Sequence, residues 1–179
     1  MTFSPINNLA NVILVDFNDN PIGTMEKLEA HQKGVLHRAF SIFLYNDQNQ
    51  LLLQKRADDK YHSSGLWTNT CCSHPAPGEH LTQSAQNRLK EEMGISTHLT
   101  PLFSFTYKAA LENGLTEHEL DHVFIGNFNA SPLPNPAEAS NWKYASLDEI
   151  NREIIASPNN YTYWFKEVYQ RVFRYILSK

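Results

Sequence analysis

Two long strand-like segments, residues 103–111 and 115–128, are joined by the turn sequence Glu112-Asn-Gly114. An Asn-Gly pair between two such segments is a strong signal for a β-hairpin, because both residues tolerate the positive φ angles of tight turns. A hairpin of this length indicates that a β-sheet forms the framework of the chain.

Shorter segments with strand or helix patterns make the organisation α/β. Strands are predicted at residues 12–16, 39–45, 51–55 and 66–73. Helices are predicted from a cap at Thr24 towards His31, along Ala85, Leu89 and Met93 up to Gly94, from the capping box Ser146–Glu149, and at residues 163–177. Loops are predicted at residues 18–23, 58–65 and 131–136. The last of these loops is rich in proline and is expected to end the run of strands.

Composition favours one domain of ordinary size, spanning residues 1–179. The chain has 179 residues, 41% of them hydrophobic, which is enough for a single core. Its net charge of -4 argues against a general nucleic-acid binder. No stretch reaches the roughly 18 apolar residues of a membrane span, and residues 1–20 lack a signal-peptide pattern. We therefore expect a cytoplasmic protein with no membrane or nucleic-acid partner.

The only two cysteines, Cys71 and Cys72, are adjacent and are followed by His74. Successive side chains of a strand point to opposite faces, so Cys72 and His74 can share a pocket while Cys71 faces away. Free cysteine is among the most buried residue types, and we expect Cys71 to belong to the core. The pattern leaves open whether Cys72 is reactive or only packed.

A second pair with the same spacing lies in the final long strand. Glu117 and Glu119 are expected on one face, and His118 and Leu120 on the other. Buried carboxylates need a partner, and a metal cation held with His31, His37 and His74 would provide one. The alternative is a solvated charge run on an edge strand. Without further information, the sequence pattern favours this alternative over a metal site. His62, His80 and His98 lie in loop-like segments and are expected at the surface.

Several stretches together resemble the type I isopentenyl-diphosphate isomerases, members of the Nudix fold family. The matching stretches are 23–31, 36–40, 51–56, 65–69, 72–75, 88–94, 117–119 and Trp164. The Nudix helix signature is kept at Glu79, Leu89, Glu91, Glu92, Gly94 and Ile95. It is altered at Ser73, where the first glycine belongs, and at Asn87 and Arg88, where Arg-Glu belongs. The missing carboxylate weakens the case for a Nudix diphosphohydrolase, the alternative function.

The resemblance implies a mixed β-sheet between helices, an N-terminal extension, and interconversion of isopentenyl and dimethylallyl diphosphate in isoprenoid precursor biosynthesis. This reaction protonates an unactivated alkene and passes through a tertiary carbocation, so it needs an acid, a base and the exclusion of water. The catalytic residues implied by the family are Cys72, Glu119, Tyr107 and Trp164. Trp164 would stabilise the cation with its π face, although its helical spacing also suits a core aromatic.

The family also implies two metal positions and a diphosphate site. A divalent metal, Mg, Mn or Zn, would be held by His31, His37, His74, Glu117 and Glu119. The diphosphate would be bound by Lys27, Arg56, Lys60 and Arg88, with a second Mg on Glu92; the alternative for each cation is a solvated surface charge. We expect a monomer or homodimer. A zinc-stabilised binding module without catalytic activity is a third, more distant hypothesis.

Overall fold

The structure is a computed structural model and describes residues 11–179. Within this range, nine strands form one mixed sheet. The strands are β1 (Asn11–Val15), β2 (Pro21–Glu26), β3 (His37–Tyr45), β4 (Leu51–Arg56), β5 (Trp67–Thr68), β6 (Cys71–Ser73), β7 (Thr100–Ala110), β8 (Thr116–Asn127) and β9 (Ala139–Ala145). The helices are α1 (Lys27–Lys33), α2 (Leu81–Met93), α3 (Leu147–Ala156) and α4 (Tyr163–Leu177).

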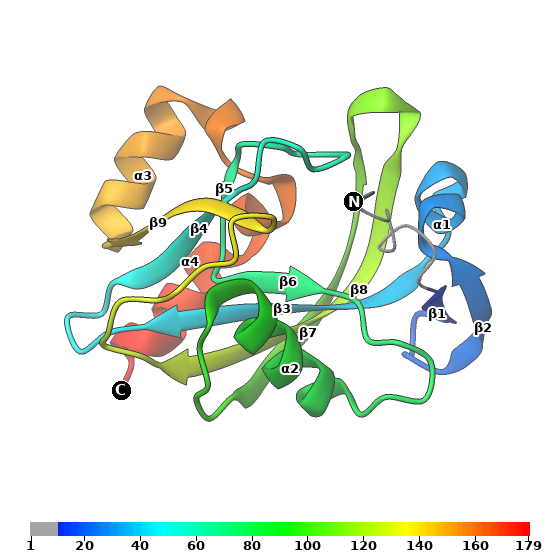
Figure 1. Cartoon of the computed structure of the whole chain (residues 1–179), viewed down its shortest axis with the longest axis horizontal. Coiled ribbons are helices and arrows are strands. Elements are labelled where there is room, and N and C mark those ends of the chain that lie inside the picture. The colour runs from blue at the N-terminus through cyan, green and yellow to red at the C-terminus, as the bar shows by residue number, and fades with distance from the viewer. Residues whose placement is uncertain (1–10) are drawn as a thin grey trace, which may run out of the picture.

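Strand β3 is the centre of this sheet (Figure 1). It pairs antiparallel with β1, β4 and β6, and parallel with β8. The β7–β8 hairpin is formed as predicted, with the turn residue Asn113 at a φ of 60°. Strands β6 and β8 both pair with β3, so residues predicted on separate strands reach the same region of the sheet.

Helices cover both faces of the sheet, as the α/β prediction requires (Figure 1). On one face, Ala85, Leu89 and Met93 of α2 pack on Phe40 and Leu52 of the sheet. On the other face, side chains from α3 and α4 pack on β3, β4, β7 and β8. The fold is therefore an α+β domain with a mixed, curled sheet between helices.

Two N-terminal boundaries differ from the prediction. The predicted loop at 18–23 ends early, because Pro21–Glu26 pairs antiparallel with β1 as strand β2. Thr24 therefore lies in a strand, and the helix that carries His31 begins at Lys27. Its cap is Glu26, whose carboxylate accepts from the backbone N–H groups of Leu28 and Glu29.

The predicted strand 66–73 is two short strands, β5 and β6, separated by Asn69 and Thr70. The side chains of these two residues take over part of the strand pairing. The Asn69 amide donates to the carbonyl oxygens of Ile42 and Cys71. The Thr70 hydroxyl accepts from the backbone of Leu44 and donates to that of Leu52. This polar insertion redirects the chain so that β6 pairs with β3, while β5 pairs with β4.

A further strand follows the proline-rich loop, so the expectation that this loop ends the sheet was wrong. Strand β9 pairs antiparallel with β4, from Leu51 opposite Ala145 to Arg56 opposite Ala139. Its pattern, Ala-Ser-Asn-Trp-Lys-Tyr-Ala, contains little β-branched sequence. The strand is stabilised by its ladder with β4 and by packing of Trp142 and Tyr144 on the core.

Candidate active site

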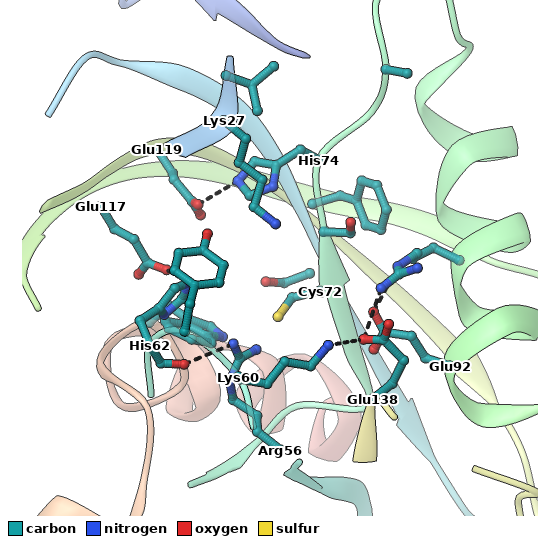
Figure 2. Close-up of a pocket in the computed structure, with 18 of the residues that line it drawn as sticks. Lys27, Arg56, Lys60, His62, Cys72, His74, Glu92, Glu117, Glu119 and Glu138 are labelled. Carbon is teal, nitrogen blue, oxygen red and sulfur yellow. Dashed lines mark hydrogen bonds and ion pairs between the residues drawn. The ribbon is translucent and has the colours of Figure 1, made fainter. Parts of the chain in front are cut away.

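A cavity of about 550 Å³ opens against β3, β6 and β8 and is closed by α2, α4 and the loop after β4. Most of the residues predicted for the site line this cavity: Lys27, Arg56, Lys60, Cys72, His74, Arg88, Glu92, Tyr107, Glu117, Glu119 and Trp164. His31 and His37 are fully buried beside it. Figure 2 shows the Cys72 sulfur between Glu117 and Glu119 on one side and Glu92 and Glu138 on the other.

Strand parity separates the two cysteines as predicted. Cys71 is fully buried in the core under α2, together with Ala85 and Leu89. Cys72 lies opposite Ser41 of β3 and faces the cavity. Burial raises the pKa of the Cys72 thiol above its usual value, so the group holds its proton at neutral pH.

The raised pKa gives a testable pH dependence for Cys72. Only the thiolate reacts with an alkylating agent, so a raised pKa lowers the reactive fraction near pH 8. We expect iodoacetamide to modify Cys72 more slowly than a free cysteine at pH 8, with a rate that still rises between pH 8 and 10. Fragmentation of the peptide that contains both cysteines in the mass spectrometer assigns the label to Cys72 or to buried Cys71. A rate that levels off below pH 8 would contradict the raised pKa.

Three imidazoles converge beside the cavity with their Nε2 atoms facing inward. His31 Nδ1 lies 2.6 Å from the carbonyl oxygen of Lys27, and His37 Nδ1 lies 2.8 Å from that of Val35. A carbonyl only accepts, so each Nδ1 carries the proton and each Nε2 has a free lone pair. His37 Nε2 lies 3.2 Å from His74 Nε2, and the buried His31 Nε2 has no partner.

This arrangement fits a divalent metal ion. One ligand atom each from His31, His37, His74 and Glu119 can be chosen so that all lie within 4.8 Å of one another. Burial lowers the pKa of His74 to about 3, so this imidazole is neutral and able to bind a cation. The buried His31 Nε2 atom has no hydrogen-bond partner, and three imidazoles with a carboxylate suit a transition metal or zinc.

The two carboxylates share Tyr107 but differ in protonation. The Tyr107 hydroxyl lies 3.0 Å from Glu117 Oε2 and 2.7 Å from Glu119 Oε2. Burial and the neighbouring Glu119 raise the pKa of Glu117 well above its usual value. Burial would also raise the pKa of Glu119, but His74 and His37 hold it well below its usual value. One hydroxyl proton cannot serve both contacts, so protonated Glu117 donates to Tyr107, which donates to ionised Glu119.

Four cationic side chains, Lys27, Arg56, Lys60 and Arg88, line the same cavity. Burial and the charges of Arg56, Arg88 and Lys60 lower the pKa of Lys27. Mutual repulsion of this kind is relieved when an anion binds among the cations. The alternative, that these are separate solvated surface charges, does not describe their placement. Cations that line one cavity in this way are suited to bind a polyanion.

A buried carboxylate that the sequence analysis missed organises two of these cations. Glu138 binds Lys60 and lies 3.0 Å from Arg88 Nη2. The sequence analysis missed Glu138 because it follows the proline-rich loop, where no further strand was expected. Glu92 lies 2.9 Å from Arg88 Nε and accepts from the Gln54 amide at 3.0 Å. Glu92 thus faces the cation side of the cavity, apart from the imidazole cluster.

Trp164 has features of both its predicted roles. It is 3% exposed and packs in the core with Phe165 and Val168. It also lines the cavity, where its ring lies 5.5 Å from the Arg56 guanidinium. Its indole N–H donates to the Asn69 side chain at 3.1 Å, which fixes the orientation of the ring.

Two solved structures have the same fold as this chain. A Deinococcus radiodurans protein, DR0079, aligns with a TM-score of 0.68 over 82% of this chain and 89% of its own, at 18% identity. A MutT protein from Methanosarcina mazei aligns with a TM-score of 0.63 over 80% of this chain and 96% of its own, also at 18% identity. A NUDIX domain profile matches residues 35–166. The chain therefore belongs to the NUDIX family.

Curated relatives narrow this assignment. The isopentenyl-diphosphate Delta-isomerase of Pectobacterium atrosepticum is 53% identical over 164 residues, 92% of each chain. Isopentenyl-diphosphate Delta-isomerase 1 of Aromatoleum aromaticum is 50% identical, over 90% of this chain and 91% of its own. Within the NUDIX family the chain belongs with these isomerases. Among residues 11–179, no helix is long and apolar enough to cross a membrane.

Proposed function

We propose that the chain catalyses the isomerisation of isopentenyl diphosphate to dimethylallyl diphosphate, with Cys72 and Glu119 as its two proton-transfer groups. One observation carries this proposal: a thiol on β6 and a carboxylate on β8 face the same cavity from either side of β3. Diphosphate hydrolysis has no use for such a pair. The isomerase relatives likewise favour isomerisation over the hydrolase alternative.

The two groups divide the chemistry of the reaction. One gives a proton to the alkene to form a tertiary carbocation, and the other removes a proton from the carbon that becomes part of the new double bond. Tyr107 donates to Glu119 and connects it to Glu117, so it positions the Glu119 carboxyl and can relay its proton. Cys72 and Glu119 exchange roles when the reaction runs in reverse.

Substrate orientation follows from the separation of charges in the cavity. Lys27, Arg56, Lys60 and Arg88 would bind the diphosphate, and Glu92 would hold a Mg ion that offsets the diphosphate charge. The hydrocarbon part then points toward Cys72, Glu119 and Trp164. Burial of Trp164 and Glu119 limits the access of water to the carbocation, which water would otherwise trap.

The imidazole cluster holds a divalent cation in this proposal. His31, His37, His74, Glu119 and Glu117 are its ligands, and Mg, Mn and Zn are the candidates. When bound, the cation supplies positive charge that favours ionised carboxylates at Glu117 and Glu119. His31 and His37 are fixed by their backbone hydrogen bonds, and His74 and His37 lie 2.8 Å and 3.5 Å from Glu119 Oε1.

One incubation tests the activity. The purified chain is given isopentenyl diphosphate and Mg, and the products are analysed for acid-labile allylic diphosphate and for released phosphate. Isomerisation produces the allylic diphosphate without phosphate. Phosphate release would support the diphosphohydrolase alternative, and unchanged substrate would support a binding module.

Substitutions of Trp164 test its role toward the carbocation. A cation-π contact in a dry site contributes about 2 kcal/mol, so Trp164→Leu should lower turnover roughly thirtyfold. Trp164→Phe keeps a weaker π face, so its turnover should lie between that of the unaltered chain and that of Trp164→Leu. KM should change less, because the neutral alkene gains little from the ring. Turnover, KM and Tm are measured for both variants; a fall in Tm with unchanged turnover per folded molecule would make Trp164 a core residue only.

A further inference from the structure

A fourth imidazole, His62, lies at the edge of the proposed metal centre although it was expected at the surface. Its side chain is only 7% exposed. The ring centroid lies 5.8 Å from that of His31 and 6.3 Å from that of Trp164. Its Nε2 atom lies 3.7 Å from Glu117 Oε1. The loop position of His62 gave no sign of this burial, because a polar loop normally lies on the surface.

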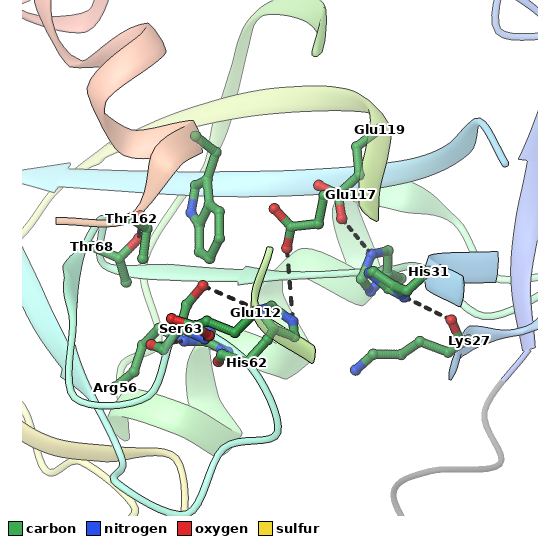
Figure 3. A network of polar contacts seen from close by, with 12 residues as sticks. Lys27, His31, Arg56, His62, Ser63, Thr68, Glu112, Glu117, Glu119 and Thr162 are labelled. Carbon is green, nitrogen blue, oxygen red and sulfur yellow. Dashed lines mark hydrogen bonds and ion pairs between the residues drawn. The ribbon is translucent and has the colours of Figure 1, made fainter. Parts of the chain in front are cut away.

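The loop around His62 is fastened to the site at several points (Figure 3). Arg56 donates to the carbonyl oxygens of His62 and Ser63, at 3.2 Å and 3.0 Å. The Ser63 N–H donates to Glu112 Oε2 in the β7–β8 turn at 3.0 Å, and Ser63 has a φ of 50°. These contacts connect the loop to β4 on one side and to the hairpin that carries Glu117 on the other. His62 is therefore held in place by its backbone.

The contacts of Glu117 show what the imidazole can do there. Tyr107 occupies Oε2, whereas Oε1 is directed to His62. His62 Nδ1 lies 3.3 Å from the Ser63 hydroxyl, which can donate to it and so leave the ring proton on Nε2. A shift of roughly 0.7 Å would bring Nε2 into hydrogen-bond range of Oε1. Both oxygens of Glu117 would then have a partner that fixes the rotation of the carboxylate.

The four-residue cluster around His74 does not contain Glu117. Ligand atoms of Glu117, His31 and His62 lie within 4.8 Å of one another in a second group, which shares His31 with the first. We propose that His62 is a positioning residue that holds Glu117 against the imidazole cluster, so that Glu117 joins the metal ligands. This inference rests on the metal centre of the proposed function.

Metal affinity tests the inference without any measurement of activity. Co²⁺ is titrated into metal-free protein against a chromophoric chelator, and the visible spectrum of the bound ion is recorded. Loss of a residue that orients a metal ligand typically weakens metal binding about 10–100-fold. We expect a loss of this size for His62→Ala, together with an altered Co²⁺ spectrum. His62→Gln keeps an N–H donor and should recover part of the affinity. His98→Ala removes an exposed imidazole and should bind as the unaltered chain does.

Two further variants keep the test decisive. His74→Ala removes a proposed ligand: if its affinity is unchanged, the metal centre itself is wrong, and the inference falls with it. If His74→Ala loses the metal while His62→Ala binds within twofold of the unaltered chain, only the role of His62 is overturned. Should His62→Ala fail to fold, Ser63→Ala replaces it. That variant keeps the imidazole, loses the hydroxyl beside Nδ1, and should bind more weakly; unchanged affinity there would overturn the inference.

Discussion

Cys72→Ala is expected to abolish nearly all turnover while leaving the fold intact. The thiol faces the cavity and is only partly buried, so its removal disturbs little packing. Deleting a proton-transfer group typically costs about 10²–10⁴ in rate, and no other thiol faces the cavity to replace it. Product formation from isopentenyl diphosphate measures the loss, and KM should change far less than kcat because the cations of the diphosphate site are untouched.

Cys71→Ala is the matched control, since the same atom is removed one residue away. Cys71 is fully buried under α2, so its loss leaves a small void that should cost about 1–2 kcal/mol of stability. Activity per folded molecule should remain near that of the unaltered chain. Chemical denaturation and assay of both variants separate the two effects. Equal kinetic damage from the two substitutions would contradict the assignment of Cys72 to the reaction.

Local rules predicted most of the framework and much of the geometry around the cavity. Alternation along a strand was sufficient to place Cys72 in the cavity and Cys71 in the core. The same rule put Glu117 and Glu119 on one face, where both contact Tyr107. The alternative of a solvated charge run was wrong, because both carboxylates are less than 7% exposed.

Local sequence patterns did not predict the features that depend on contacts between segments far apart in the sequence. Strand β9 and its neighbour Glu138 follow a proline-rich loop, and pairing with β4 and packing on the core stabilise that strand. His62 lies in a polar loop whose burial results from its anchoring on Arg56 and Glu112. His80 and His98 were assigned to the surface by the same reasoning and are exposed. Loop composition alone does not distinguish these cases, because the difference lies in the partners that the fold brings near.

Removal of the metal is expected to lower activity as strongly as the Cys72→Ala substitution does. Treatment with a strong chelator should abolish activity, and a divalent ion alone should restore it. Without a cation, the lone pairs that the Nε2 atoms of His31 and His37 direct into the cluster lose the partner that this proposal gives them.

His74→Ala should reproduce the chelator effect within a folded chain. The substitution removes the imidazole that contacts both His37 and Glu119, so one of the five proposed ligands is lost. We expect the metal affinity to fall at least about a hundredfold. This loss is larger than the usual effect of altering a residue that only orients a ligand. Metal content after dialysis is measured beside turnover, with His98→Ala as the control. Full occupancy in His74→Ala would remove this residue from the centre, whereas full turnover without metal would separate the cluster from the reaction.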